Sequence, residues 1–200
     1  MAGLVLGLLV ASASASYAAQ RDELFEVSSK VVLLDRVLAH YGPEAEPARR
    51  LLRAGVAQTI DRIWPSGAAA PQLDPLGTRG EPLFDRIEAL APKNENQKAL
   101  KAEAESVAID LGQIRLLMFA QAGSQISTPL LVLLIFWFAI TFVGFGMFAP
   151  GNPTAVVALG LAALAVSGAV FIMVEMYAPF EGIVQLSSLP LREALEHLGR

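Results

Sequence analysis

Glu175 is the side chain whose position most directly suggests a chemical role, because it ends an uncharged run over residues 154–174. An acidic group in the middle of a bilayer costs about 2.5–3.5 kcal/mol on insertion scales, so such groups are candidates for ion binding. About 20 helical residues cross the hydrocarbon core, so a helix that begins near Pro153 brings Glu175 close to the membrane surface. Two interpretations stay open for Glu175: a group at the mouth of an ion pathway, or an interfacial anchor.

Ser12 and Ser16 are further candidates for an ion pathway, because they lie one helical turn apart within the apolar run 2–19. Their hydroxyl groups would then face the ion. Serine hydroxyls in membrane helices also bond to their own backbone or join neighbouring helices, which is the more common role.

Four charged residues lie on two helices that we expect to face each other, and two of them are close to the predicted membrane surface. Arg115 and Asp110 precede the second apolar run, whereas Asp35 and Arg36 follow the first. One interpretation is a charged vestibule or gate, in which Arg115 contributes to the ion pathway. The other is solvated or paired surface charge, which we favour because exposed pairs are common and contribute little energy.

Enzymatic chemistry is not predicted by any motif in the chain. There is no cysteine, and the two histidines, His40 and His197, have no neighbours at metal-ligand spacing. Nucleotide-binding glycine loops and a nucleophile elbow are also missing. We therefore expect no catalytic residues, no metal and no cofactor. The net charge of -4 argues against a nucleic-acid partner, which would favour a basic face.

The composition requires apolar surface to face lipid, because 54% of the 200 residues are hydrophobic and only 17% are charged. Soluble domains carry about 25% charged residues. Three runs have the length of a membrane span: residues 2–19, 129–148 and 154–174. The second and third are separated by a short turn in which Asn152 can cap a helix that begins at Pro153, so they form an antiparallel hairpin.

Small residues recur at helical spacing in the first run, and they are Gly3, Gly7, Ala11, Ala15 and Ala19. Such a face lets a neighbouring helix approach closely, so we predict helix packing there. A cleaved signal peptide remains an alternative, with Ala13-Ser14-Ala15 as the cleavage site, although no Lys or Arg precedes the apolar run.

Lys and Arg are missing from the hairpin turn and occur on the other side of every span. The positive-inside rule therefore places the middle domain and the C-terminus in the cytoplasm. The predicted division is a first membrane helix (1–20), a cytoplasmic helical domain (21–123), a membrane hairpin (124–177) and an amphipathic tail (178–200).

Apolar residues spaced by three and four predict the helices of the middle domain and tail. The helix after the first span has Leu24, Val27, Val31, Leu34, Leu38 and Tyr41 on one face and ends at Gly42-Pro43. A helix over 44–64 has Ala48, Leu52, Val56, Ile60 and Ile63. A short helix is expected over 82–90, and a long one from Asn94 into the second span has Leu100, Ala104, Val107, Leu111, Ile114 and Met118. The tail helix has Leu191, Leu195 and Leu198.

Several segments resemble, in the same order along the chain, those of the bestrophin-like bacterial membrane proteins, a family of unknown function. The tail over 175–188 carries Pro179-Phe180-Glu181-Gly182, and Leu189-Pro190 follows it. Residues 4–13, 33–44 and Asp61-Arg62-Ile63-Trp64-Pro65 also resemble the family. In the family pattern Met1 falls at the beginning of the second span, and an upstream span would return the N-terminus to the cytoplasm.

The resemblance implies a helical membrane protein and, through the more distant bestrophin channels, a homo-oligomer that passes small inorganic ions through an axial pore. Pro179, Phe180, Gly182 and Pro190 match the motif that follows the last span of those channels. The acidic run that follows it there is missing here, so the resemblance does not extend to a calcium clasp. We expect an oligomeric ion channel or pore surrounded by lipid. The alternative is a non-conducting scaffold or sensor whose cytoplasmic bundle binds a partner.

Overall fold

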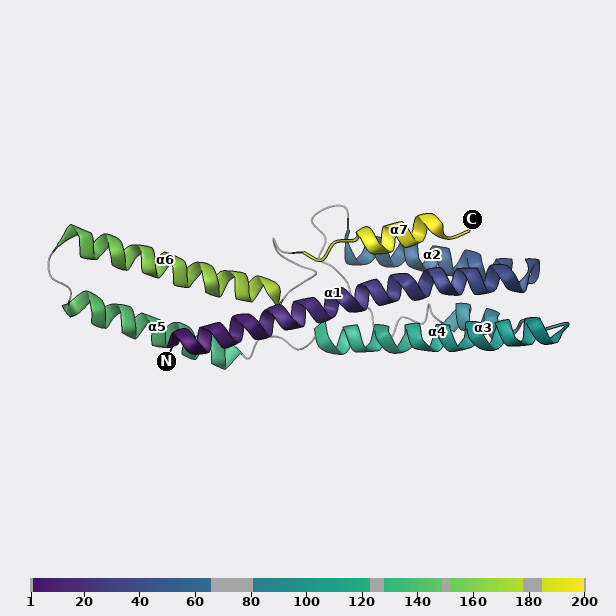
Figure 1. Cartoon of the computed structure of the whole chain (residues 1–200), viewed down its shortest axis with the longest axis horizontal. Coiled ribbons are helices and arrows are strands. Elements are labelled where there is room, and N and C mark those ends of the chain that lie inside the picture. The colour runs from purple at the N-terminus through teal and green to yellow at the C-terminus, as the bar shows by residue number, and fades with distance from the viewer. Residues whose placement is uncertain (1, 66–80, 123–127, 149–151, 178–184, 200) are drawn as a thin grey trace. The chain divides into compact units, whose positions relative to one another are not determined.

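The computed structural model describes residues 2–65, 81–122, 128–148, 152–177 and 185–199. No strand occurs in these ranges, and three of the helices are long and apolar enough to cross a membrane, so the predicted all-α membrane class is confirmed. The elements in chain order are α1 (Ala2–Tyr41), the short 3-10 helix η1 (Pro43–Ala45), α2 (Glu46–Ile63), α3 (Glu81–Glu88), α4 (Glu95–Ala122), α5 (Thr128–Phe148), α6 (Pro153–Met176) and α7 (Leu189–His197) (Figure 1).

The chain forms two compact units. The membrane unit comprises Met1–Ala19 and Ser124–Gln185, and the helical unit comprises Gln20–Gly123 and Leu186–Arg200. Helix α1 contributes its first half to the membrane unit and its second half to the helical unit.

In the membrane unit α5 and α6 pack along each other through one face of each helix. Leu134 of α5 and Met173 of α6 are buried, whereas the outward residues, such as Phe136 and Leu164, are exposed. Exposed side chains of this size on two helices whose only charged residue is Glu175, near the end of α6, are suited to lipid and unsuited to water. The Asn152 side chain accepts a hydrogen bond from Thr154 N at 3.0 Å, which confirms the predicted cap of α6.

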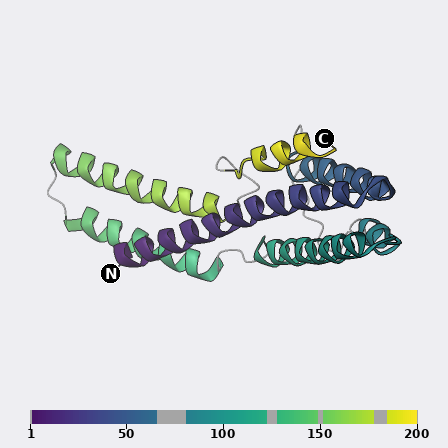
Figure 2. The ribbon, with the colours of Figure 1, turned by 45° about the vertical axis from the view of Figure 1, so that its right-hand side comes forward.

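The core of the helical unit lies between α1, α2, α3, α4 and α7. All five predicted core residues of α2 are buried, and so are most of those predicted on α1 and α4. Figure 2 shows α1 and α4 running side by side, as they do in Figure 1. The predicted spacing thus located the core because a helix turn brings residues three and four apart onto one face.

Helix boundaries differ from the prediction by a few residues. Helix α1 ends at Tyr41 as expected, because Gly42 adopts a φ of 121°, which an L side chain rarely adopts. The predicted helix over 44–64 begins instead with η1, and α2 starts at Glu46. The predicted helix over 82–90 is α3, which ends at Glu88, and α4 ends at Ala122.

Candidate functional site

Helices α1 and α6 bring two polar residues together in the membrane unit. Tyr177 Oη lies 3.5 Å from Ser12 Oγ, a long contact that nevertheless fixes which turns of the two helices meet. Tyr177 is the residue directly after α6 and keeps helical backbone angles. Ser12 is therefore level with the end of α6.

This contact shows at which end of the membrane unit the predicted pathway residues lie. Helix α6 is 24 residues long, which corresponds to about 36 Å at 1.5 Å per residue. Its last turns contain Glu175, and Ser16 lies one turn beyond Ser12 on α1. Ser12, Ser16, Glu175 and Tyr177 thus gather at the same end of the membrane unit. The sequence predicted three of these residues but not their common level, which depends on a contact between distant helices.

Glu175 and Tyr177 occupy different sides of α6. Two residues along a helix correspond to a rotation of about 200°. Tyr177 faces Ser12 on α1, so Glu175, which is half-buried, is directed to another side at the same level. The arrangement can offer hydroxyl groups on one side and a carboxylate on the other. Arg115, the fourth predicted pathway residue, lies half-buried on α4 in the helical unit.

The predicted packing face of α1 is exposed in the part of the chain that the structure describes. Gly3, Gly7, Ala11 and Ala15 are all exposed, and a Cβ atom added to either glycine would meet nothing within 4 Å. The inward face contains Ala13 instead, which is completely buried. A neighbouring helix against the small residues therefore stays a prediction.

Of the predicted family motif, Pro179, Phe180 and Gly182 lie outside the described residues. Pro190 lies in the first turn of α7, where a proline ring is tolerated because the first backbone N–H groups of a helix have no partner within it. No cluster of three or more metal-ligating side chains occurs in the described ranges.

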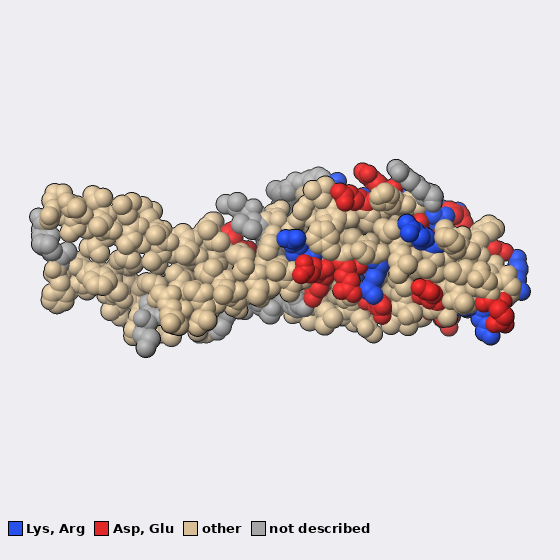
Figure 3. Space-filling view, viewed as in Figure 1, with Lys and Arg blue, Asp and Glu red and all other residues tan. Residues whose placement is uncertain are grey.

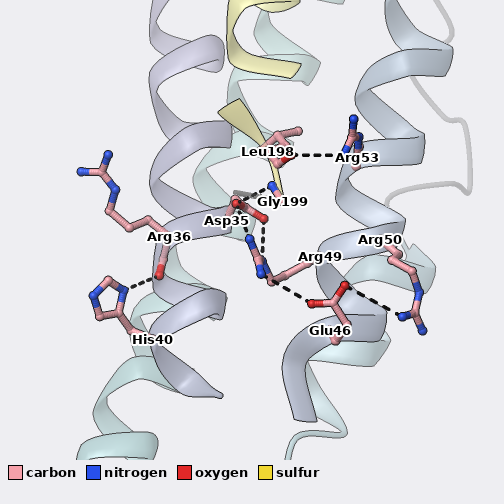
Figure 4. Close-up of polar contacts among 9 residues, drawn as sticks. All are labelled: Asp35, Arg36, His40, Glu46, Arg49, Arg50, Arg53, Leu198 and Gly199. Carbon is pink, nitrogen blue, oxygen red and sulfur yellow. Dashed lines mark hydrogen bonds and ion pairs between the residues drawn. The ribbon is translucent and has the colours of Figure 1, made fainter. Parts of the chain in front are cut away.

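A buried ion pair connects three segments of the helical unit, and sequence analysis missed it. Arg49 on α2 donates to Asp35 on α1 through Nε at 2.8 Å and through Nη2 at 2.9 Å. Asp35 also accepts a hydrogen bond from the backbone N–H of Gly199 at 3.1 Å (Figure 4). Asp35 is paired, as one of our interpretations expected, but it is only 5% exposed, so its assignment to the surface was wrong.

Opposing effects act on the pKa of Asp35, which lies well beyond the apolar part of α1. Burial raises this pKa, but the hydrogen bonds from Arg49 and Gly199 together favour the carboxylate more strongly. The pKa of Asp35 is therefore held below its ordinary value. The carboxylate remains charged at neutral pH and pairs with Arg49, whose own pKa its partner Asp35 raises.

The C-terminal segment of residues 185–199 is fastened to α2 and the residue that follows it near both of its ends. Trp64 Nε1 donates to Leu186 O at 2.8 Å, and Arg53 Nη1 donates to Leu198 O at 3.3 Å. Between these two points Leu191 and Ala194 are buried against the core. Gly199, with a φ of 86°, presents its N–H to Asp35 in a backbone conformation that favours glycine.

A second polar link joins α1 to α4. Lys30 Nζ donates to Asp110 Oδ2 at 2.7 Å, and Glu26 lies 3.8 Å from the same ammonium group. Asp110, which we had considered for a vestibule with Arg115, is therefore paired. Figure 3 shows that acidic and basic side chains gather over the helical unit, whereas the visible face of the membrane unit has almost none.

The fold and these contacts define a helical membrane protein with three candidate spans and a charged, separately packed helical unit. The chain belongs to the bestrophin-like family, since the model of the bestrophin-like domain matches residues 1–191. No curated protein and no solved structure matches the chain.

Proposed function

We propose that this protein is an oligomeric ion channel or pore of a bacterial inner membrane, with its helical unit and C-terminus in the cytoplasm. Its membership in the bestrophin-like family supports a channel-like role. The distribution of Lys and Arg supports the orientation, because the helical unit carries them and the hairpin turn does not.

The observation that carries the proposal is the set of polar residues that gathers at one end of the membrane unit. Ser12, Ser16, Glu175 and Tyr177 lie within about one turn of the same level, in helices whose other side chains in the membrane unit are mostly apolar. In a pore these hydroxyl and carboxylate oxygens would replace part of the water around a small cation as it enters or leaves. A single chain with three spans is too small to enclose such a path, so the pore requires several copies.

Ion flux in liposomes tests this proposal through Glu175→Gln, which keeps the size of the side chain and removes its charge. We expect the cation-to-anion permeability ratio to fall several-fold, because a carboxylate at a pore mouth attracts cations. Glu196→Gln is the matched control, since Glu196 lies exposed on α7 in the helical unit. An unchanged ratio in the Glu175 variant would assign Glu175 to interfacial anchoring.

A non-conducting scaffold or sensor is the second candidate, and the outer surface of α4 favours it. Ile109, Leu116 and Leu117 are exposed in the helical unit, where no lipid is expected to cover them. A scaffold would use this surface for a different protein and would show no flux as a well-folded sample.

A further inference from the structure

The outward faces of α1 and α4 in the helical unit each combine apolar and polar residues. On α1 the exposed residues include Phe25, Leu33 and Arg36. On α4 a second row with spacing of three and four lies away from the core row, and its exposed members are Ala102, Ser106, Ile109, Gln113, Leu116 and Ala120. A helix that carries large apolar residues on a second side, outside its core row, is suited to pack in two interfaces.

Two contacts fix how α1 and α4 are aligned. Lys30 pairs with Asp110 at 2.7 Å, and Gln97 Nε2 donates to Tyr41 O at 3.0 Å. The helices therefore run antiparallel, and each residue of α1 in the helical unit has a residue of α4 at the same level. Counted from these two contacts, Leu33 is level with Ser106 and Arg36 with Glu103, and Phe25 is level with residues 113–115, within one turn of Leu116.

The apolar residues of the two faces fit each other at these levels. Phe25 is 47% exposed and Leu116 is 53% exposed, and both side chains are large and apolar. Leu33, which is 43% exposed, is level with the small Ser106 and lies less than one turn from Ile109, which is 48% exposed. A leucine that meets a small residue beside an isoleucine can pack closely, as a knob packs into a hole.

The charged residues of the two faces are also complementary. Arg36 is basic and Glu103 is acidic, and both are exposed. Neither has an ion-pair partner within the part of the chain that the structure describes. The two faces thus place one pair of opposite charges, Arg36 and Glu103, at the same level and carry large exposed apolar residues beside it.

We propose that the outward face of α1 in one subunit packs against the outward face of α4 in the next subunit. In a ring whose axis is parallel to these helices, neighbouring copies are at the same level, so Arg36 meets Glu103 and Phe25 lies within one turn of Leu116. Two different faces that fit each other make a head-to-tail contact, which generates a ring when the rotation closes. This inference rests on the proposed homo-oligomer and names the surface through which its copies meet.

Disulfide cross-linking tests the contact on a clean background, because the chain has no cysteine. Two differently tagged copies are produced together, one with Leu33→Cys and the other with Ser106→Cys, and the purified sample is oxidised. We expect a cross-linked dimer that carries both tags. The control pairs Leu33→Cys with Ala120→Cys, which lies about 20 Å further along α4 at 1.5 Å per residue. Its yield should be at least roughly ten-fold lower, because a disulfide requires Cα atoms within about 7 Å.

A charge exchange provides an independent readout of the same contact. Arg36→Glu and Glu103→Arg, each alone, place like charges together and should raise the concentration for half-maximal assembly by roughly two- to five-fold. The double variant restores the pair and should return assembly to that of the unmodified protein.

The outcomes separate this inference from the proposed channel. An oligomer without the Leu33–Ser106 cross-link, or with a cross-link between two Leu33→Cys copies, overturns the proposed contact and leaves the channel standing. A strictly monomeric protein overturns both. The expected cross-link in a sample without ion flux supports the contact and contradicts the channel.

Discussion

The membrane unit and the helical unit use similar aliphatic side chains but differ in what stabilises them. In the membrane unit α5 and α6 bury one narrow face each and expose large apolar residues on the other sides. In the helical unit the buried rows of α1, α2 and α4 meet in one core, and a buried Asp35–Arg49 pair joins α1 to α2. The difference indicates that water exclusion drives packing in the helical unit, whereas lipid contact satisfies most of the apolar surface in the membrane unit.

Removal of the Asp35 carboxylate should give the largest effect on the helical unit. Asp35→Ala leaves Arg49 largely buried and charged, and loss of one partner of a buried pair costs about 3–5 kcal/mol. We expect a lower unfolding temperature in detergent and faster proteolysis of the C-terminal segment, because Gly199 also loses its acceptor. Glu46→Ala is the control, since Glu46 is an exposed partner of Arg49 at 3.5 Å. Equal losses in both variants would mean that the burial of Asp35 contributes nothing.

The pH dependence of stability gives a second measure of Asp35. A carboxylate whose pKa is lowered in the folded state stabilises the fold above its unfolded pKa, and this contribution is lost as the pH falls through the folded pKa. The difference in unfolding temperature between the unmodified protein and Asp35→Asn should therefore be constant near neutral pH and shrink below the ordinary value of 3.8. A difference that grows with acid would contradict the lowered pKa.

The next largest effect should come from shortening a leucine, and it should differ between the two units. Leu34 on α1 is completely buried, and Leu34→Ala should lower the free energy of unfolding by about 2–5 kcal/mol. Leu133 on α5 is 59% exposed, so Leu133→Ala should change it by less than about 1 kcal/mol. Thermal unfolding of both variants in one detergent provides the measurement. A large effect at Leu133 would show that its outward face packs against protein, as an oligomer interface in the membrane requires.

Trp64 should give the smallest of these effects. Trp64→Phe keeps most of the ring and removes the donor to Leu186 O, a bond whose loss costs about 0.5–1.5 kcal/mol. Hydrogen exchange of the segment 185–199 should rise, while exchange in α5 and α6 should stay unchanged. Faster exchange in both units would contradict a local role for this contact.

Helix faces were predictable from the sequence, whereas long-range polar contacts were not. The core row of α2 was predicted completely, because its members follow the turn of one helix. Asp35, by contrast, was assigned to the surface. Its partners lie on another helix and at the end of the chain, and nothing in the local spacing connects Asp35 with Arg49 or Gly199. The one indication in the sequence that Asp35 is buried was its position directly after the core residue Leu34.

The candidate site shows the same limit. Ser12, Ser16 and Glu175 carry hydroxyl and carboxylate oxygens, so the sequence indicated that they could face an ion. The ends of the apolar runs indicated that Glu175 lies close to the membrane surface. Their common level follows from the contact between Ser12 and Tyr177, which are far apart in the sequence. Which sides of α1 and α6 face each other is decided by tertiary packing.

Ion flux from liposomes, combined with the subunit number of the same purified sample, tests the central proposal most directly. The account predicts flux from a ring-like homo-oligomer. A well-folded monomer that conducts no ions would contradict it.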